Sequence, residues 1–160
     1  MTLRCGHGFD AHRLAEGRPF ILGGVHIEYE RGPLGHSDGD ALAHAVADAL
    51  LGACALGDLG RHFPSDDPRY AGADSLDLLE QTAALVRRAG YEPANVDATV
   101  VVERPRLSAH LGAMQRRVAS ALGLDVGAVS VKAKTSDGMG YTGDGTGIAA
   151  YAVASVRGAG

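Results

Sequence analysis

The sequence predicts one α+β domain, with a mixed sheet of four-stranded type, helices packed on one face of it and a small hairpin. Three observations point to this fold class. The chain has 160 residues, a usual size for a single domain. Apolar residues alternate in some segments and recur with helical spacing in others. These segments follow one another in an order that mixes hairpin and crossover connections.

Local signals define each predicted element. Gly23 and Gly24 are expected to form the turn of the hairpin because they separate two short apolar runs. Asp74 or Ser75 is expected to begin a helix that Gly90 ends, with acidic residues leading and arginines closing it. The full set is a first strand ending near residue 12, a hairpin within 17–32, helices over 38–55, 74–90 and 105–123, a loop over 57–75 of a length typical of functional loops, and strands over 95–104, 129–136 and 147–156.

Composition and charge argue against two classes of partner. Hydrophobic residues make up 46% of the chain and charged residues 21%, which is typical of a globular domain. The net charge of −4 argues against a nucleic-acid partner, which a broad basic surface would bind. No apolar run reaches the ~20 residues of a membrane span, so no membrane partner is expected. With Cys5 and Cys54 as the two thiols and no targeting segment at the N-terminus, we expect a cytoplasmic protein.

One glycine motif is misleading. Gly138, Gly140 and Gly143 spell GxGxxG after a predicted strand. A dinucleotide site would need a helix next and an acidic residue about 20 positions later. A strand pattern follows instead, so these glycines are expected to form a turn.

The strongest chemical signal is a group of ligand-type side chains on two predicted elements. Asp40, His44 and Asp48 lie at i, i+4 and i+8, on one face of the first helix. Asp10 and His12 lie at i and i+2 at the end of the first strand, where both point to the same side. One carboxylate and two imidazoles from these elements match an open, catalytic zinc site, because structural zinc sites are closed by four ligands. The alternative is a core histidine satisfied by a neighbouring carboxylate.

The start of the same helix predicts an anion contact. His36 and Ser37 lie where free backbone N–H groups and the helix dipole favour negative charge. Ser37 and Asp40 also resemble a capping box, which can hold alongside an anion site. A surface loop position is the alternative for His36.

Four segments together resemble the 2-C-methyl-D-erythritol 2,4-cyclodiphosphate synthase family. They read GHGFDAHRL, GHSDGDALAHAVADALLGACALGDLGRHFPSDDP, ERPRL and VKAKTSDGMGYTG. They occur in the family's order over nearly the whole chain, and each holds several polar residues at fixed spacing that folding alone does not require. The resemblance implies a single cyclodiphosphate synthase domain over residues 1–160. It also implies a homotrimer with active sites at the subunit interfaces.

The resemblance implies an enzyme of the non-mevalonate isoprenoid pathway. This enzyme is a phosphorus-oxygen lyase that converts 4-diphosphocytidyl-2-C-methyl-D-erythritol 2-phosphate into 2-C-methyl-D-erythritol 2,4-cyclodiphosphate and releases CMP. The implied cofactors are Zn²⁺ and a second divalent cation, Mg²⁺ or Mn²⁺. The chain is expected to be a stand-alone version, without the enzyme of a preceding step fused to it.

Matching positions carry the family's roles to individual residues. The implied zinc ligands are Asp10, His12 and His44, and the implied catalytic residues are His36 and Thr135, which stabilise the transition state. Asp137 stands where a glutamate often binds the second cation. Implied contacts to the methylerythritol end are Ser37, Asp58, Leu59, Gly60, Phe63, Pro64, Ser65, Asp66, Asp67 and Tyr141. Implied contacts to the cytidine nucleotide are Val102, Glu103, Arg104, Pro105, Arg106, Leu107, Ser108, Ala133, Lys134 and Ser136.

Some positions depart from the family pattern. Asp137 is one methylene shorter than the usual glutamate. Asp144 and Thr146 replace the Arg and Glu of a common GRGEG segment, so an axial cavity for a diphosphate is not assumed. Lys132 and Lys134 share one face of a predicted strand, and we expect at least one of them to contact a phosphate.

Two questions stay open at the level of sequence. We expect either Asp40 or Asp48 to orient a metal-binding histidine through its other ring nitrogen. Two other functional classes also fit the zinc pattern. One is a non-catalytic module that binds metal and nucleotide, and the other is a zinc phosphohydrolase that releases linear phosphates.

Overall fold

A computed structural model describes residues 2–158. Seven strands form one five-stranded sheet, in the order β4-β1-β7-β5-β6, and a separate β2–β3 pair. The strands are β1 (Leu3–Glu16), β2 (Phe20–Leu22), β3 (Val25–Ile27), β4 (Arg31–Pro33), β5 (Tyr91–Val101), β6 (Val129–Lys134) and β7 (Gly147–Gly158). The helices are α1 (Ala41–Ala53), α2 (Leu59–His62), α3 (Ser75–Arg88), α4 (Leu111–Leu122) and α5 (Gly140–Gly143), with 3₁₀ turns at Pro68–Tyr70 and Val126–Ala128.

The sheet is mixed, as predicted, but the predicted four-stranded sheet is one strand short. Strands β5 and β6 are parallel, and the other neighbours are antiparallel. The additional strand, β4, pairs Leu14 with Pro33 at the end of β1. Its sequence is Arg-Gly-Pro, and both glycine and proline are depleted in strands. Local sequence therefore carries no signal for β4, which forms because β1 continues beyond His12 to Glu16.

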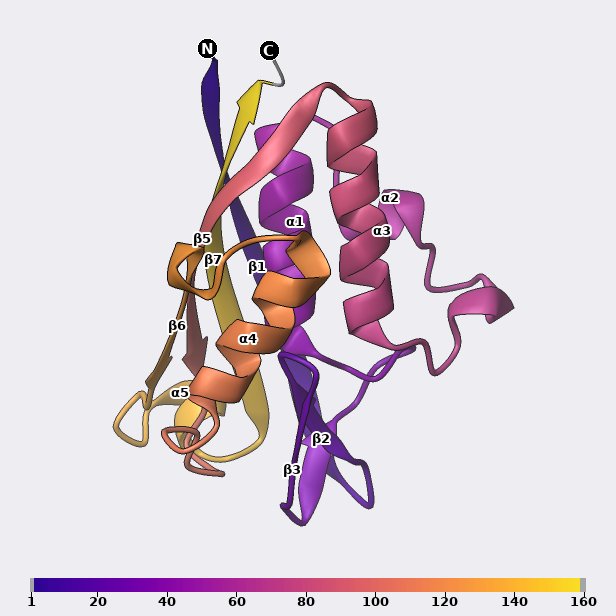
Figure 1. Ribbon diagram of the computed structural model, residues 1–160. Helices are drawn as coiled ribbons and strands as arrows, with labels where there is room; N and C mark the ends of the chain where they lie inside the picture. Colours follow the sequence, from indigo (N-terminus) through magenta and orange to yellow (C-terminus); the bar gives the residue numbers. More distant parts are fainter. Residues whose placement is uncertain (1, 159–160) are drawn as a thin grey trace.

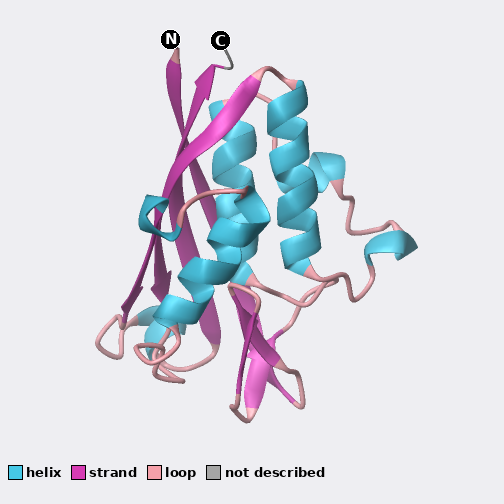
Figure 2. Cartoon of the chain, in the orientation of Figure 1, coloured by secondary structure: helices cyan, strands magenta, loops and turns pink. Residues whose placement is uncertain are grey.

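Helices α1, α3 and α4 lie on one face of the sheet and enclose the core (Figures 1 and 2). Leu42, Leu50, Leu79, Met114 and Ile148 are fully buried there. The opposite face carries large apolar side chains that are exposed in the single chain, including Phe9, Tyr151 and Val153, each more than two-fifths exposed.

Close contact between β1 and α1 sets the geometry of the later site. A Cβ atom added at Gly8 would lie 1.9 Å from the Ala45 carbonyl oxygen, and one at Gly6 would lie 2.0 Å from that of Ala49. Only glycine permits this approach of helix backbone to strand backbone. It brings the strand residues that follow Gly8 directly against the first turn of α1.

Most helix ends follow capping signals. Asp40 caps α1, so this helix begins three residues later than predicted, and Asp74 caps α3. Helix α4 begins at Leu111, although 105–123 was expected to be helical, because the residues before it form a loop. Gly123 closes α4 in the left-handed conformation.

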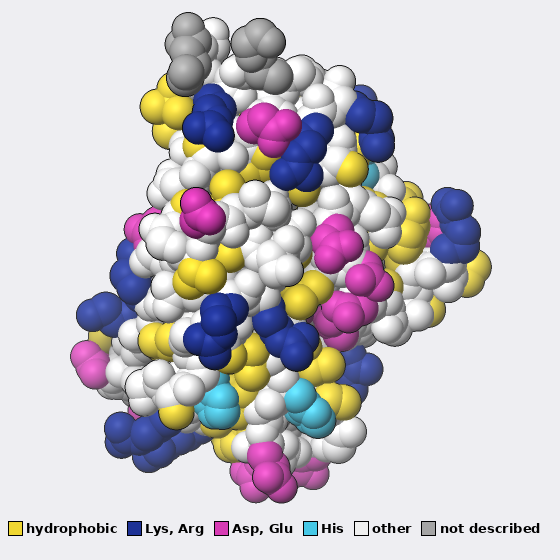
Figure 3. Space-filling view, in the orientation of Figure 1, with side chains coloured by type: hydrophobic (Ala, Val, Ile, Leu, Met, Phe, Trp, Pro, Cys, Tyr) yellow, Lys and Arg dark blue, Asp and Glu magenta, His cyan; other side chains and the backbone are white. Residues whose placement is uncertain are grey.

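Two surface features bear on partners. Among the described residues, no helix is both long enough and apolar enough to span a bilayer. On the face seen in Figure 3, basic side chains are spread over the surface, and several acidic side chains lie next to one another right of the centre.

Candidate active site

Asp10, His12 and His44 converge where β1 meets α1. Asp10 Oδ2 lies 2.7 Å from His12 Nε2 and 2.9 Å from His44 Nδ1. One ligand atom from each residue lies within 4.8 Å of the other two. Asp10 and His12 point to the same side because they are two positions apart on β1, and His44 reaches them from the first turn of α1.

The charge of this triad suits a cation. Burial by itself raises the pKa of Asp10, but the contacts with the His12 and His44 rings outweigh it and leave that pKa below its ordinary value. Burial lowers the pKa of His12, and the contact with Asp10 outweighs it in the same way, so that pKa is raised. Two imidazole nitrogens beside an ionised carboxylate form a donor set that fits a divalent metal ion.

The second ring nitrogen of each histidine also has a partner. His12 Nδ1 lies 3.0 Å from the carbonyl oxygen of Leu34. His44 Nε2 lies 2.8 Å from Ser75 Oγ and 3.1 Å from Ser37 Oγ. The expectation that Asp40 or Asp48 orients a histidine is therefore wrong.

Asp40 and Asp48 instead bind backbone N–H groups. Asp40 is fully buried and accepts from Ala43 at 3.0 Å, from Gly23 at 2.9 Å and from Gly24 at 2.8 Å, which ties the β2–β3 turn to the start of α1. Asp48 accepts from Leu59 N at 2.7 Å and so anchors α2. The predicted capping box is also wrong, because Asp40 is the cap and Ser37 turns towards His44.

A pocket of ≈ 190 Å³ opens beside the triad. It is lined by His12, His36, Ser37, His44, Leu59, Gly60, Phe63, Ser65, Tyr70 and Leu78. Five of the residues expected to contact substrate, together with His36, therefore lie near one another, at the N-terminal end of α1 and in the segment around α2. Tyr70 and Leu78 were not predicted, because aromatic and aliphatic residues in a loop and a helix carry no chemical signal of their own.

Other predicted substrate residues do not line this pocket. Asp58 caps α2, and Asp67 caps the 3₁₀ turn at Pro68–Tyr70 while its carbonyl lies 3.1 Å from His36 Nε2. Pro64 and Asp66 lie in the same loop, outside the pocket lining. Tyr141 lines a different space of ≈ 330 Å³, which also touches His12.

A third pocket, of ≈ 230 Å³, lies at the carboxyl ends of the parallel strands β5 and β6. Its lining is Val102, Glu103, Arg104, Pro105, Arg106, Leu107, Ser108, Ala133, Lys134 and Thr135. This set contains every residue expected to contact the nucleotide except Ser136. Glu103 Oε2 is buried and has no hydrogen-bond partner among the described residues. Such an acceptor is uncommon in a folded chain and is available to a donor from outside it.

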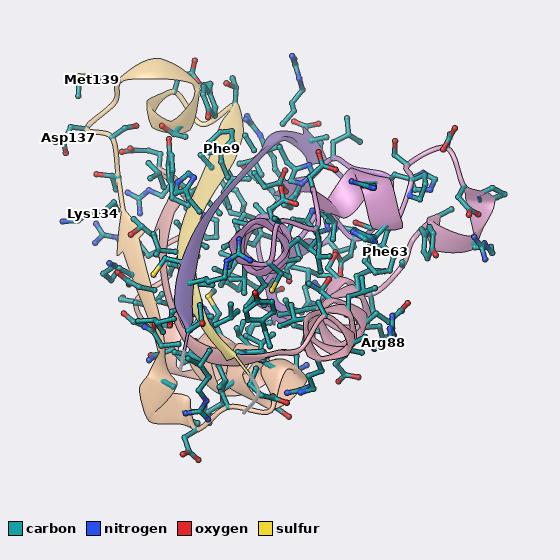
Figure 4. All side chains as sticks on the ribbon, turned by 90° about the horizontal axis from the view of Figure 1, so that it is seen from above. Phe9, Phe63, Arg88, Lys134, Asp137 and Met139 are labelled. Carbon is teal, nitrogen blue, oxygen red and sulfur yellow. The ribbon has the colours of Figure 1, made fainter. Side chains whose placement is uncertain are left out.

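The triad and this third pocket are separated within one chain. Strands β1 and β6 are three positions apart in the sheet, which corresponds to about 14 Å. Figure 4 shows Lys134 and Asp137 on one side of the molecule and Phe63 on the other. Thr135 Oγ1 donates to Asp137 Oδ1 at 3.3 Å, so these two predicted residues lie together, but away from the triad. Lys132 pairs with Asp97 at 2.7 Å, whereas Lys134 lines the pocket.

The fold and site together define an α+β protein with a candidate divalent-metal centre next to one pocket, and a second pocket at the ends of two parallel strands. Residues 3–157 match the model of the YgbB family. The chain belongs to the YgbB family.

Named relatives agree with this assignment. The chain is 54% identical to the 2-C-methyl-D-erythritol 2,4-cyclodiphosphate synthase of Trichlorobacter lovleyi, over 94% of this chain and 96% of that protein. A solved 2C-methyl-D-erythritol-2,4-cyclodiphosphate synthase in a CDP-bound form superposes with a TM-score of 0.88, at 37% identity, over 96% of this chain and 100% of that one. The bifunctional IspDF from Campylobacter jejuni superposes with a TM-score of 0.94 at 39% identity, over 98% of this chain, which spans 42% of that longer protein.

Proposed function

We propose that this protein catalyses an intramolecular phosphoryl transfer in the non-mevalonate isoprenoid pathway. It converts 4-diphosphocytidyl-2-C-methyl-D-erythritol 2-phosphate into 2-C-methyl-D-erythritol 2,4-cyclodiphosphate and releases CMP, which makes it a phosphorus-oxygen lyase. The observation that carries the proposal is the convergence of Asp10, His12 and His44 beside a pocket. The chain that holds them is 54% identical to a 2-C-methyl-D-erythritol 2,4-cyclodiphosphate synthase. The CDP in a related structure supports a cytidine nucleotide as the leaving group.

The metal centre is assigned as zinc. Asp10, His12 and His44 offer two nitrogens and one oxygen, which leaves a position open, as catalytic zinc sites require. A second divalent cation, Mg²⁺ or Mn²⁺, is assigned to Asp137, whose carboxylate lies beside Thr135. The bound cations supply positive charge that offsets the repulsion between an anionic nucleophile and an anionic electrophile.

The protein's own residues orient the substrate and stabilise charge. The attacking 2-phosphate is already ionised, so the reaction needs no general base, and positioning dominates catalysis. His36 lines the pocket and its Nε2 donates to the Asp67 carbonyl at 3.1 Å, which holds the ring at the pocket wall. The role left to His36 and Thr135 is to stabilise the oxygens whose negative charge grows in the transition state.

A complete site needs a neighbouring copy of the chain. The pocket at the ends of β5 and β6, which we call the nucleotide pocket and which Thr135 lines, lies apart from the triad within one chain, and Asp137 lies on its side of the molecule. A homotrimer that packs through the uncovered sheet face, with Phe9 and Tyr151 in contact, would bury exposed apolar surface. It would set the nucleotide pocket of one subunit beside the triad of the next. The two free thiols fit a reducing compartment, so we assign the enzyme to the cytoplasm.

One experiment separates this reaction from the two alternatives. The protein is incubated with the cytidine substrate and Mg²⁺, and products are followed by phosphorus NMR. Cyclic diphosphate with CMP is the expected result. Linear phosphates would indicate a phosphohydrolase, and no turnover would indicate a binding module. Light scattering tests the shared site, because a stable monomer with full activity contradicts it.

A further inference from the structure

A series of partly buried polar contacts leads away from His44 on the side opposite Asp10. His44 Nε2 lies 2.8 Å from Ser75 Oγ, and the Ser75 hydroxyl in turn contacts Asp38 Oδ1. Ser75 is 1% exposed. Asp38 is itself held in place, because Oδ2 accepts from Ser75 N at 2.9 Å and Oδ1 accepts from Asp40 N at 3.0 Å.

Counting protons shows which group donates and which accepts in each of these hydrogen bonds. A carboxylate only accepts hydrogen bonds, so the single hydroxyl proton of Ser75 is donated to Asp38. Ser75 Oγ is then an acceptor towards His44, and Nε2 must carry a proton. A neutral imidazole with its proton on Nε2 has the lone pair on Nδ1, the nitrogen that lies 2.9 Å from Asp10.

We infer that Ser75 and Asp38 are positioning residues that hold His44 with its proton on Nε2 and its Nδ1 lone pair directed at the metal position. This inference rests on the proposal that Asp10, His12 and His44 bind the metal. Nothing in the sequence pattern pointed to Ser75, which lies 31 positions from His44 and begins α3.

The two histidines are oriented by different means. His12 uses the main-chain carbonyl of Leu34, which no side-chain substitution removes. His44 depends on side chains, and its orientation is therefore open to mutation. Ser37 Oγ is a second acceptor at 3.1 Å, but it lines the pocket beside the triad. Among the described residues its other side-chain contact is Ser75 Oγ at 3.4 Å and not a carboxylate. The shorter distance from His44 Nε2 and the contact with the Asp38 carboxylate identify Ser75 as the main partner of His44.

The test compares Ser75→Ala with Thr82→Val in the full-length protein. Thr82 is a matched control, because it is also fully buried on α3 and its hydroxyl donates within the helix, to the Leu78 carbonyl. The dissociation constant for zinc is measured by competition with a chelator. Ser75→Ala is expected to weaken zinc binding by about 10- to 100-fold, the usual loss for a residue that orients a ligand, and Thr82→Val to leave it unchanged.

A spectroscopic readout separates orientation from a loss of stability. In the zinc-loaded wild-type protein, the Nε2 proton of His44, assigned with His44→Ala, is expected to be protected from exchange with water and visible by proton NMR. In Ser75→Ala it is expected to shift or to exchange rapidly, while the corresponding Nδ1 proton of His12 stays unchanged. Should Ser75→Ala fail to fold, Asp38→Asn is used, with a smaller loss of zinc affinity expected.

Three results would overturn the inference. The first is a zinc dissociation constant within twofold of wild type in both Ser75→Ala and Asp38→Asn. The second is an equal loss in Ser75→Ala and Thr82→Val, which would reflect helix stability only. The third is an unmoved Nε2 proton in Ser75→Ala. Failure of the wild-type protein to bind zinc is distinct from all three, because it would overturn the metal site itself.

Discussion

The metal triad and the nucleotide pocket are built in different ways. The triad comes from the middle of β1 and the first turn of α1, two elements pressed together through Gly6 and Gly8, and each of its histidines has a second hydrogen-bond partner. The proposed nucleotide pocket comes from strand ends and the loop after β5, and it contains Glu103 Oε2, an acceptor that has no partner in the part of the chain that the structure describes. All three side chains of the first region come from one chain, whereas we propose that the second region is completed by a ligand or a neighbouring subunit.

The largest expected effect comes from His44→Ala. Wild-type protein is expected to carry about one zinc per chain, and this variant none, because two ligands do not retain the ion. Turnover is lost with the metal, while binding of CMP to the other pocket is retained. Elemental analysis and calorimetry measure the two quantities. Stoichiometric zinc in the variant would contradict the assignment of the triad.

His36→Ala removes an imidazole from the pocket beside the triad, where we propose that it contacts substrate, and leaves Asp10, His12 and His44 in place. By analogy with the loss of one donor to a developing oxyanion, kcat is expected to fall by about 10²–10³. Zinc content is expected to stay at the wild-type value, since no atom of His36 belongs to the triad. Steady-state kinetics with elemental analysis checks both. A kcat unchanged from wild type would remove His36 from the catalytic residues.

Gly8→Ala tests whether the contact of β1 with α1 holds the triad together. The added methyl group would meet the Ala45 carbonyl at 1.9 Å, so the free energy of unfolding is expected to fall by at least about 1–3 kcal/mol. Zinc affinity should fall with it. Gly127→Ala is the control, because nothing lies within 4 Å of the added atom and a surface change usually stays within about 0.5 kcal/mol. Urea denaturation measures both, and equal midpoints for the two variants would contradict the prediction.

The smallest expected effect lies at the nucleotide pocket. Lys134→Ala removes a cation from its lining, and a hydrogen bond to a charged group is worth about 1.5–3 kcal/mol. The Kd for CDP is therefore expected to rise roughly tenfold or more. Lys132→Ala is the matched control, since Lys132 lies on the same strand but pairs with Asp97. Calorimetry with CDP distinguishes them, and weaker binding in Lys132→Ala alone would reverse the assignment of the two lysines.

Much of this molecule could be read from local pattern. Alternation along β1 predicted that Asp10 and His12 share one side of the strand, and helical spacing predicted the face of α1 that carries His44, because side-chain direction follows directly from backbone geometry. The family resemblance also anticipated most of the nucleotide pocket lining, from Val102 to Ser108 and from Ala133 to Thr135.

Hydrogen-bond partners could not be read in this way. The stripe of Asp40, His44 and Asp48 showed which residues share a face, but not which atoms they meet. Backbone N–H groups of Gly23, Gly24 and Leu59 occupy the two acids, and a serine from α3 occupies the histidine. These partners come from segments 11 to 31 residues away, so they depend on how the elements pack and not on the spacing within one helix.

The sequence by itself therefore determined the class of fold, the order of the longer strands and helices and the choice of three ligand-type residues, because each depends on local geometry or on a short motif. The tertiary structure alone decided that Arg31–Pro33 adds a fifth strand, that Ser75 and Asp38 stand behind His44, and that the nucleotide pocket lies apart from the triad. Those features arise from contacts between segments distant in the chain, and no local propensity encodes which distant groups will meet.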